Sequence, residues 1–160
     1  MMDTFVIGIG NENRGDDGAG LFAAREIREM VPVGIYVLEM GADPAKLIDV
    51  WRGARRAYVI DCSAPAGVPG AIRRFAPDHK PLPSIFSAVS SHDFGLGAAI
   101  ELARAMGCLP QRLIVYAIEG GRFDRGSPPQ DAVLQAAVVV AKAVCEELNE
   151  NCPPYNGTAR

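Results

Sequence analysis

The sequence predicts an α/β fold built on a mostly parallel sheet, with helices on both faces. Short apolar runs of β type alternate along the chain with longer segments whose apolar residues recur at helical spacing. Strand–helix alternation of this kind gives parallel sheets, because each helix carries the chain back to the same edge. The composition, 49% hydrophobic and 22% charged, is that of a globular protein. With 160 residues in all, we expect one domain over residues 1–149.

The first part of the chain supplies two strand–helix units. Thr4–Gly10 is a short apolar run that ends in glycines, which is typical of a strand buried on both faces. A polar loop over Asn11–Asp17 leads into a helix predicted over Gly18–Met30, where apolar residues lie three or four positions apart. Gly34–Leu38 is predicted as the second strand. A proline at the first turn indicates a helix over Pro44–Trp51.

The remainder adds three strands and two helices. The middle strand of the three is the weakest in pattern, so we expect it at an edge of the sheet. The three are predicted over Ala57–Asp61, Ala71–Phe75 and Leu113–Ile118. Serines at 90–91 offer caps for a helix from about His92 to Met106, and Asp131–Asn149 predicts a terminal helix. Residues 150–160 are expected to form a disordered tail.

Charge and cysteine content exclude several classes of protein. The net charge is −3, and no basic patch or arginine run stands out in the sequence, so we expect no nucleic-acid partner. No apolar run approaches the roughly 18 residues of a membrane span, so we expect no membrane partner. The four cysteines form no C-x-x-C pair, which favours reduced thiols and a cytoplasmic location. The chain also lacks a complete dinucleotide fingerprint, a P-loop, a nucleophile elbow and an H-E-x-x-H motif.

Three polar clusters fall where a parallel sheet normally binds its ligands, at the carboxyl ends of the strands. Asp16 and Asp17 follow the first strand, Asp61 ends the third, and His92 opens the helix before the last strand. We therefore expect them to converge. Two carboxylates and one imidazole suit a hard or borderline divalent cation and leave positions open for water or substrate. Asp17, Asp61 and His92 are thus the predicted metal ligands.

Each of these residues also has a purely structural interpretation. Asp17 could cap the following helix, and Asp61 could cap a turn, although a carboxylate at a strand end is costly unless it is used. His92 at a helix start fits a neutral ligand better than a charged imidazole, because the helix dipole there favours anions. Cys62 could be a nucleophile, but we favour a small apolar residue packed under the sheet edge. His79 lies in a polar, proline-rich loop and is expected at the surface.

Several motifs resemble those of one known family. Gly8–Asn11 followed by Asp16–Gly20 resembles the G-x-G-N … D-[DE]-G-x-G opening of hydrogenase maturation endopeptidases. Val59–Asp61 resembles that family's second ligand strand, and the segment around His92 resembles its [ST]-x-H-x-x-x-L segment. Residues 117–128 resemble its last strand and the following loop. The resemblance spans residues 5 to about 145, nearly the whole domain.

The resemblance implies a three-layer α/β/α sandwich with a mostly parallel five-stranded sheet. It also implies a metal-dependent endopeptidase that removes the C-terminal extension of a nickel–iron hydrogenase large-subunit precursor after nickel insertion. Asp17, Asp61 and His92 carry over as metal-contacting, catalytic residues. Asp16 is expected to orient a ligand or water, and Gly41, kept from a glycine-rich turn of the family, is expected near substrate. Nickel is the expected metal; the precursor itself can supply it, and other divalent ions can substitute.

Two other functions remain open at this stage. The first is a non-catalytic maturation chaperone that binds the same precursor, which would keep the fold and lose the ligands. The second is a general metallopeptidase that acts on small peptides without any hydrogenase precursor. Because Asp17, Asp61 and His92 are all present, the residues favour an enzyme over the chaperone.

Overall fold

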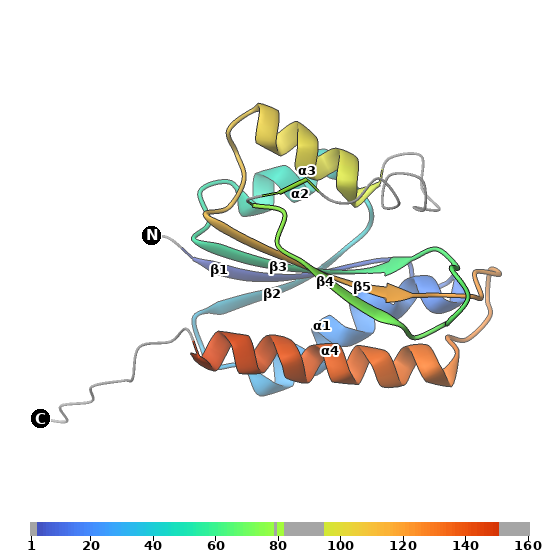
Figure 1. The fold of residues 1–160 in the computed structure, drawn as a ribbon. Coiled ribbons are helices and arrows are strands. Elements are labelled where there is room, and N and C mark those ends of the chain that lie inside the picture. The colour runs from blue at the N-terminus through green and yellow to red at the C-terminus, as the bar shows by residue number, and fades with distance from the viewer. Residues whose placement is uncertain (1–2, 79, 82–94, 151–160) are drawn as a thin grey trace, which may run out of the picture.

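A five-stranded sheet forms the middle layer of the molecule, between two layers of helices (Figure 1). The computed structural model describes residues 3–78, 80–81 and 95–150. The predicted three-layer α/β/α architecture is confirmed. The strands are β1 (Thr4–Ile9), β2 (Ile35–Met40), β3 (Arg56–Ser63), β4 (Ile72–Phe75) and β5 (Arg112–Glu119).

The strand order is β2-β1-β3-β5-β4, and every neighbouring pair is parallel except β4–β5. The antiparallel β4 lies at the edge, as its weak sequence pattern predicts. The chain moves from β1 to β2 on one side and then places β3 on the other side of β1. The order of the strands therefore reverses at β1 and β3, which is the point where sheets of this kind bind ligands.

Each face of the sheet carries its own hydrophobic core. Helices α1 (Ala19–Met30) and α4 (Asp131–Glu150) cover one face, and α2 (Pro44–Trp51) and α3 (Leu96–Ala105) cover the other (Figure 1). The strands feed both cores because successive side chains point to opposite faces. In β3, Tyr58 and Ile60 belong to the α1/α4 core, whereas Ala57 and Val59 belong to the α2/α3 core; all four are almost fully buried. This two-sided burial explains why the central strands β1, β3 and β5 contain long apolar runs.

Helix boundaries follow local chemistry where the sequence provides a signal. α2 occupies the predicted range, because the Asp43 side chain accepts a hydrogen bond from the Lys46 amide and Pro44 stands at the first turn. The loop predicted over Asn11–Asp17 is partly wrong. A short 3-10 helix, η1, spans Gly15–Gly18 and contains both aspartates, and α1 follows it directly.

Two predicted boundaries fall partly outside the described residues. The helix expected from about His92 has a described start at Leu96, where an extended Gly95 is the N-cap; Ser90, Ser91 and His92 lie outside the described part. The disordered tail was expected to begin at residue 150, but Glu150 is the last residue of α4. Residues 151–160 lie outside the described part of the chain. No helix in the described part of the chain is long and apolar enough to cross a bilayer.

Candidate active site

The candidate residues from the first half of the chain lie at the edge of the sheet where the parallel strands end. Asp16 and Asp17 lie in η1, directly after β1, and Asp61 lies near the end of β3. α1 and α3 both begin at this same edge (Figure 1). Asp61 shares its face of the sheet with Val59 and Ala57, the face that α3 covers.

Glycines allow the backbone to close tightly around this edge. A Cβ atom on Gly10 would stand 2.0 Å from the Asp17 carbonyl oxygen. A Cβ on Gly20 would stand 2.3 Å from the carbonyl oxygen of Ile60 and 2.4 Å from that of Ile9. Both distances are far below van der Waals contact, and the obstructing atoms are backbone. The two glycines thus let η1 and the first turn of α1 press against the ends of β1 and β3, which brings Asp17 toward Asp61.

Asp16 ties two loops together. Its fully buried carboxylate accepts hydrogen bonds from the amides of Gly121 (2.8 Å), Arg122 (2.8 Å) and Gln130 (2.7 Å), and from the Gln130 side chain (2.6 Å). Burial raises the pKa of Asp16, but these hydrogen bonds outweigh it and hold the pKa below its usual value. Asp16 therefore stays ionised and anchors η1, with Asp17, to the loop between β5 and α4. A direct role in orienting a metal ligand stays a prediction.

Asp17 and Asp61 interact with each other. Asp17 is 2% exposed. Burial raises the pKa of Asp61 to about 7, and the charge of Asp17 adds to the rise; a hydrogen bond from the Cys62 amide (2.8 Å) opposes it. The two predicted ligands thus lie near enough to repel, although they are 44 positions apart in the sequence. This pair is the part of the predicted convergence that the described residues contain.

Cys62 stands in the combined field of the carboxylates. Burial and the charges of Asp61, Asp17, Asp16 and Glu119 raise the pKa of its thiol far above the usual value. A thiol held protonated in this way is a poor nucleophile. The interpretation of Cys62 as a packed side chain rather than a nucleophile is therefore supported.

Glu119 is a buried carboxylate at this edge that the sequence reasoning missed. It ends β5, is 1% exposed, and accepts hydrogen bonds from the amides of Ala66 (2.7 Å) and Val68 (2.8 Å). Although burial raises its pKa, these hydrogen bonds and the charge of Arg73 bring the pKa below its usual value. The sequence does contain a signal for it, because Glu119 is an acidic residue that follows an apolar run, as Asp61 is. It holds the loop that follows β3 against β5 and so shapes the rim beside Asp61.

A cavity of about 540 Å³ flanks the same edge where β1 and β2 end. Its walls include Asn11, Glu12, Met40 and Gly41. Arg25 crosses it from α1, with ion pairs to Glu12 (2.7 Å) and Glu39 (2.7 Å). Gly41, predicted to lie near substrate, has no heavy atom within 4 Å of where its Cβ would stand. Asn11, Glu12 and Asn13 in its lining belong to the loop that leads to Asp17, although neither Asp17 nor Asp61 lines the cavity itself.

The third predicted ligand, His92, and the predicted surface residue, His79, both lie outside the described residues. Among residues 3–78, 80–81 and 95–150, no three histidine, cysteine or acidic side chains group as a metal site. The described pair nevertheless fits two corners of such a site. Asp17 and Asp61 are mutually repelling oxygen donors at one edge, and a bound cation would relieve that repulsion.

Fold and site together define an α/β protein with a carboxylate pair at the point where the strand order reverses. A family model, HycI, described as hydrogenase maturation protease, matches residues 23–147 of this chain. The chain therefore belongs to the hydrogenase maturation protease family, whose role is the C-terminal processing of the hydrogenase large subunit. The matched range contains Asp61 and His92, whereas Asp17 lies before it.

Solved structures of the family share the fold. The maturation protease HycI from Thermococcus kodakarensis KOD1 is 22% identical, with a TM-score of 0.70 over 92% of this chain and 93% of that one. The endopeptidase HybD from E. coli is 17% identical, with a TM-score of 0.75 over 92% and 94%. HybD from Thermococcus kodakarensis is 28% identical, with a TM-score of 0.66 over 92% and 99%. A search of curated protein sequences found no match.

Proposed function

We propose that this chain is a metal-dependent endopeptidase that cuts the C-terminal extension from a nickel–iron hydrogenase large-subunit precursor once nickel has entered that precursor. The observation that carries the proposal is the Asp17–Asp61 pair at the reversal of the strand order. Membership of the protease family supports the hydrolytic part of the proposal.

Asp17, Asp61 and His92 would hold the metal, which supplies Lewis-acid polarisation of a carbonyl or activation of a water. Asp17 is fixed from behind, because its neighbour Asp16 is anchored by four hydrogen bonds. Asp61 is fixed by the hydrogen bond from the Cys62 amide. The two carboxylates are thus held in place before substrate arrives, which lowers the cost of forming the site.

The cavity beside Gly41 is the proposed seat of the precursor's C-terminal segment. It lies where β1 and β2 end, and its lining includes the carboxylates of Glu12 and Glu39, both paired with the guanidinium of Arg25. Arg25 offsets both acidic side chains and links the cavity wall to α1. The large subunit is the proposed partner, and the enzyme is placed in the cytoplasm with it; the free thiols of Cys62, Cys108 and Cys145 agree with a reducing compartment.

The test is cleavage of a purified nickel-loaded precursor, followed by mass spectrometry of its C-terminus. The intact chain is expected to remove one short C-terminal peptide. Asp61→Asn, Asp17→Asn and His92→Ala are each expected to lower the rate by at least about a hundredfold, since each removes a ligand. His79→Ala should cleave like the unchanged protein. Binding of the precursor without any loss of mass would favour the chaperone, and equal cleavage of unrelated peptides would favour a general metallopeptidase.

A further inference from the structure

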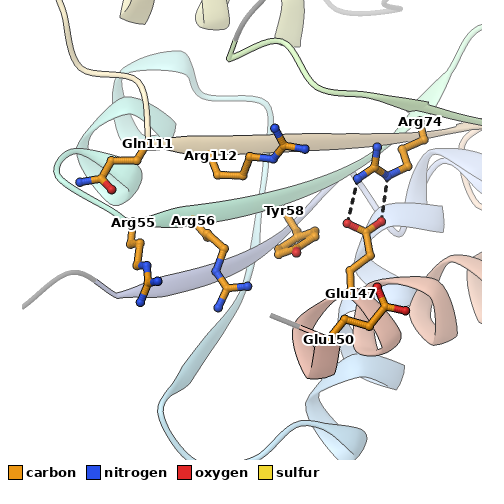
Figure 2. A pocket seen from close by; sticks show the side chains of 8 residues that line it. All are labelled: Arg55, Arg56, Tyr58, Arg74, Gln111, Arg112, Glu147 and Glu150. Atoms are coloured by element: carbon orange, nitrogen blue, oxygen red, sulfur yellow. Dashed lines mark hydrogen bonds and ion pairs between the residues drawn. The ribbon is translucent and has the colours of Figure 1, made fainter. Parts of the chain in front are cut away.

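A second polar cavity opens at the opposite edge of the sheet, where β3 and β5 begin (Figure 2). Its volume is about 660 Å³, within the range of small-molecule sites. Four arginines line it against two glutamates, although the whole chain carries a net charge of −3. The cavity is therefore a local concentration of positive charge on an acidic protein.

The sheet register explains why these arginines meet. Arg56 of β3 and Arg112 of β5 are paired positions of neighbouring parallel strands. Arg74 of β4 stands opposite Tyr116 of β5. These three arginines lie on the face that α1 and α4 cover. Arg56 is two positions before the core residue Tyr58, and Arg112 is two positions before the core residue Ile114, so each shares a face with its core neighbour. The last turns of α4 form the facing wall.

One of the arginines is already neutralised. Glu147 of α4 forms a two-point ion pair with Arg74, at 2.8 and 2.9 Å, and also accepts a hydrogen bond from the Tyr116 hydroxyl. Figure 2 shows this pair at one side of the cavity, with Arg55, Arg56 and Arg112 away from it. The negative charge of Glu147 is thus committed to Arg74. The charges that remain in the cavity belong to the three other arginines and to Glu150.

Arg56 is the residue that points to a ligand. Its Nε and Nη1 atoms are buried and have no hydrogen-bond partner among the described residues. Buried polar groups are almost always hydrogen-bonded, and an orphaned charged donor costs more than a neutral one. The paired position on β5 adds the like charge of Arg112, whose ion pair with Asp78 is long, at 3.5 Å. Both costs would be removed by an anion in the cavity.

We propose that this cavity is a binding site for a small, doubly charged oxyanion, held by the guanidinium groups of Arg56 and Arg112 with Arg55 at the rim. The guanidinium fork presents parallel N–H donors that match the oxygens of a phosphate or a carboxylate. A charge of −2 would balance the excess of arginine over glutamate in the lining. The site lies at the opposite end of the strands from Asp17 and Asp61, so it is independent of the proposed peptidase chemistry.

The test is isothermal titration of the full chain with inorganic phosphate and, separately, with succinate, at an ionic strength fixed by sodium chloride. One saturable site is expected for at least one of the two anions. Phosphate alone would assign a phosphate group, and succinate alone a dicarboxylate. If neither anion shows saturable binding, the proposal is overturned. Any heat of mixing would then reflect only general screening of the arginine charges by the added ions.

Variants locate the site. Arg56→Gln and Arg112→Gln are each expected to weaken binding at least about tenfold, or 1.4 kcal/mol. Arg52→Gln, an exposed arginine at the C-cap of α2 that is not among the lining residues, is the matched control and should bind like the unchanged protein. Arg56 is partly buried, so its substitution can also disturb folding. The binding measured for the variant of the exposed Arg112 therefore decides whether the site is assigned correctly. Undiminished binding by Arg112→Gln would overturn the assignment. So would an NMR titration in which the amide chemical shifts that change centre on Asp17 and Asp61 instead of residues 55–58 and 111–112.

Discussion

At the scale of single residues, the acidic side chains at the carboxyl edge are used in two ways. Asp16 and Glu119 accept several backbone hydrogen bonds each, so they join loops and stay ionised. Asp17 and Asp61 repel each other across the end of the sheet. The first pair builds the rim of the site, and the second pair is the one that we propose to bind a cation. Substitution should therefore affect stability in one pair and activity in the other.

Asp16→Ala is expected to lower the free energy of unfolding by about 3 kcal/mol, because it removes the buried carboxylate that accepts hydrogen bonds from three backbone amides. Chemical denaturation followed by circular dichroism measures the change. Asp49→Ala is the control: Asp49 is exposed on α2 and makes one weak ion pair with Arg52, so its effect should stay within about 0.5 kcal/mol. A loss for Asp16→Ala no larger than that of the control would contradict the anchoring role.

At the scale of elements, the close approach of α1 to the strands makes a clear prediction at Gly20. Alanine normally favours a helix over glycine by about 1 kcal/mol. At Gly20 the added Cβ would meet the backbone oxygens of Ile60 and Ile9 at 2.3 and 2.4 Å, and overpacking of that kind costs roughly 1–3 kcal/mol or more. Gly20→Ala should therefore destabilise the protein in thermal unfolding, whereas Gly41→Ala, in open space, should not. A higher melting temperature for Gly20→Ala would refute the tight contact.

The attachment of α4 to β4 and β5 predicts a pH dependence of stability. Burial raises the pKa of Glu147, but its hydrogen bonds with Arg74 and Tyr116 prevail, so its pKa in the folded state lies below the ordinary 4.5. The stabilisation is therefore complete above about pH 4.5 and is lost as the pH falls through the lower, folded-state pKa. Glu147→Gln should be less stable than the unchanged protein at pH 7, and the gap should narrow at pH 3. Urea unfolding at both pH values measures it; a constant gap would contradict the assignment.

The sequence predicted elements better than it predicted their local geometry. The strands and α2 were predictable because buried runs and caps such as Asp43 are local signals. The short helix that carries Asp16 and Asp17 was not, because it depends on hydrogen bonds from residues 121–130, more than a hundred positions away. The proximity of Asp17 to Asp61 was predictable from topology, since parallel strands end at one edge. The arginine cavity was not foreseen, because it depends on the register between β3 and β5.

At the scale of the whole molecule, the two ends of the sheet differ in charge. The carboxyl edge concentrates aspartate and glutamate beside the cavity along β1 and β2. The amino edge concentrates arginine beside α4. A carboxylate-rich edge favours an approaching cation, as the proposed function requires.

The most direct test of the central claim compares nickel-loaded with nickel-free large-subunit precursor. A site of oxygen and nitrogen donors without thiolate selects poorly among divalent ions, so the requirement for nickel should come from the precursor that already holds it. We expect the nickel-loaded precursor to lose its C-terminal peptide even with a mild chelator present. The nickel-free precursor should stay intact when free nickel and the chelator are added together. Equal cleavage of the two precursors, measured by mass spectrometry, would contradict the account.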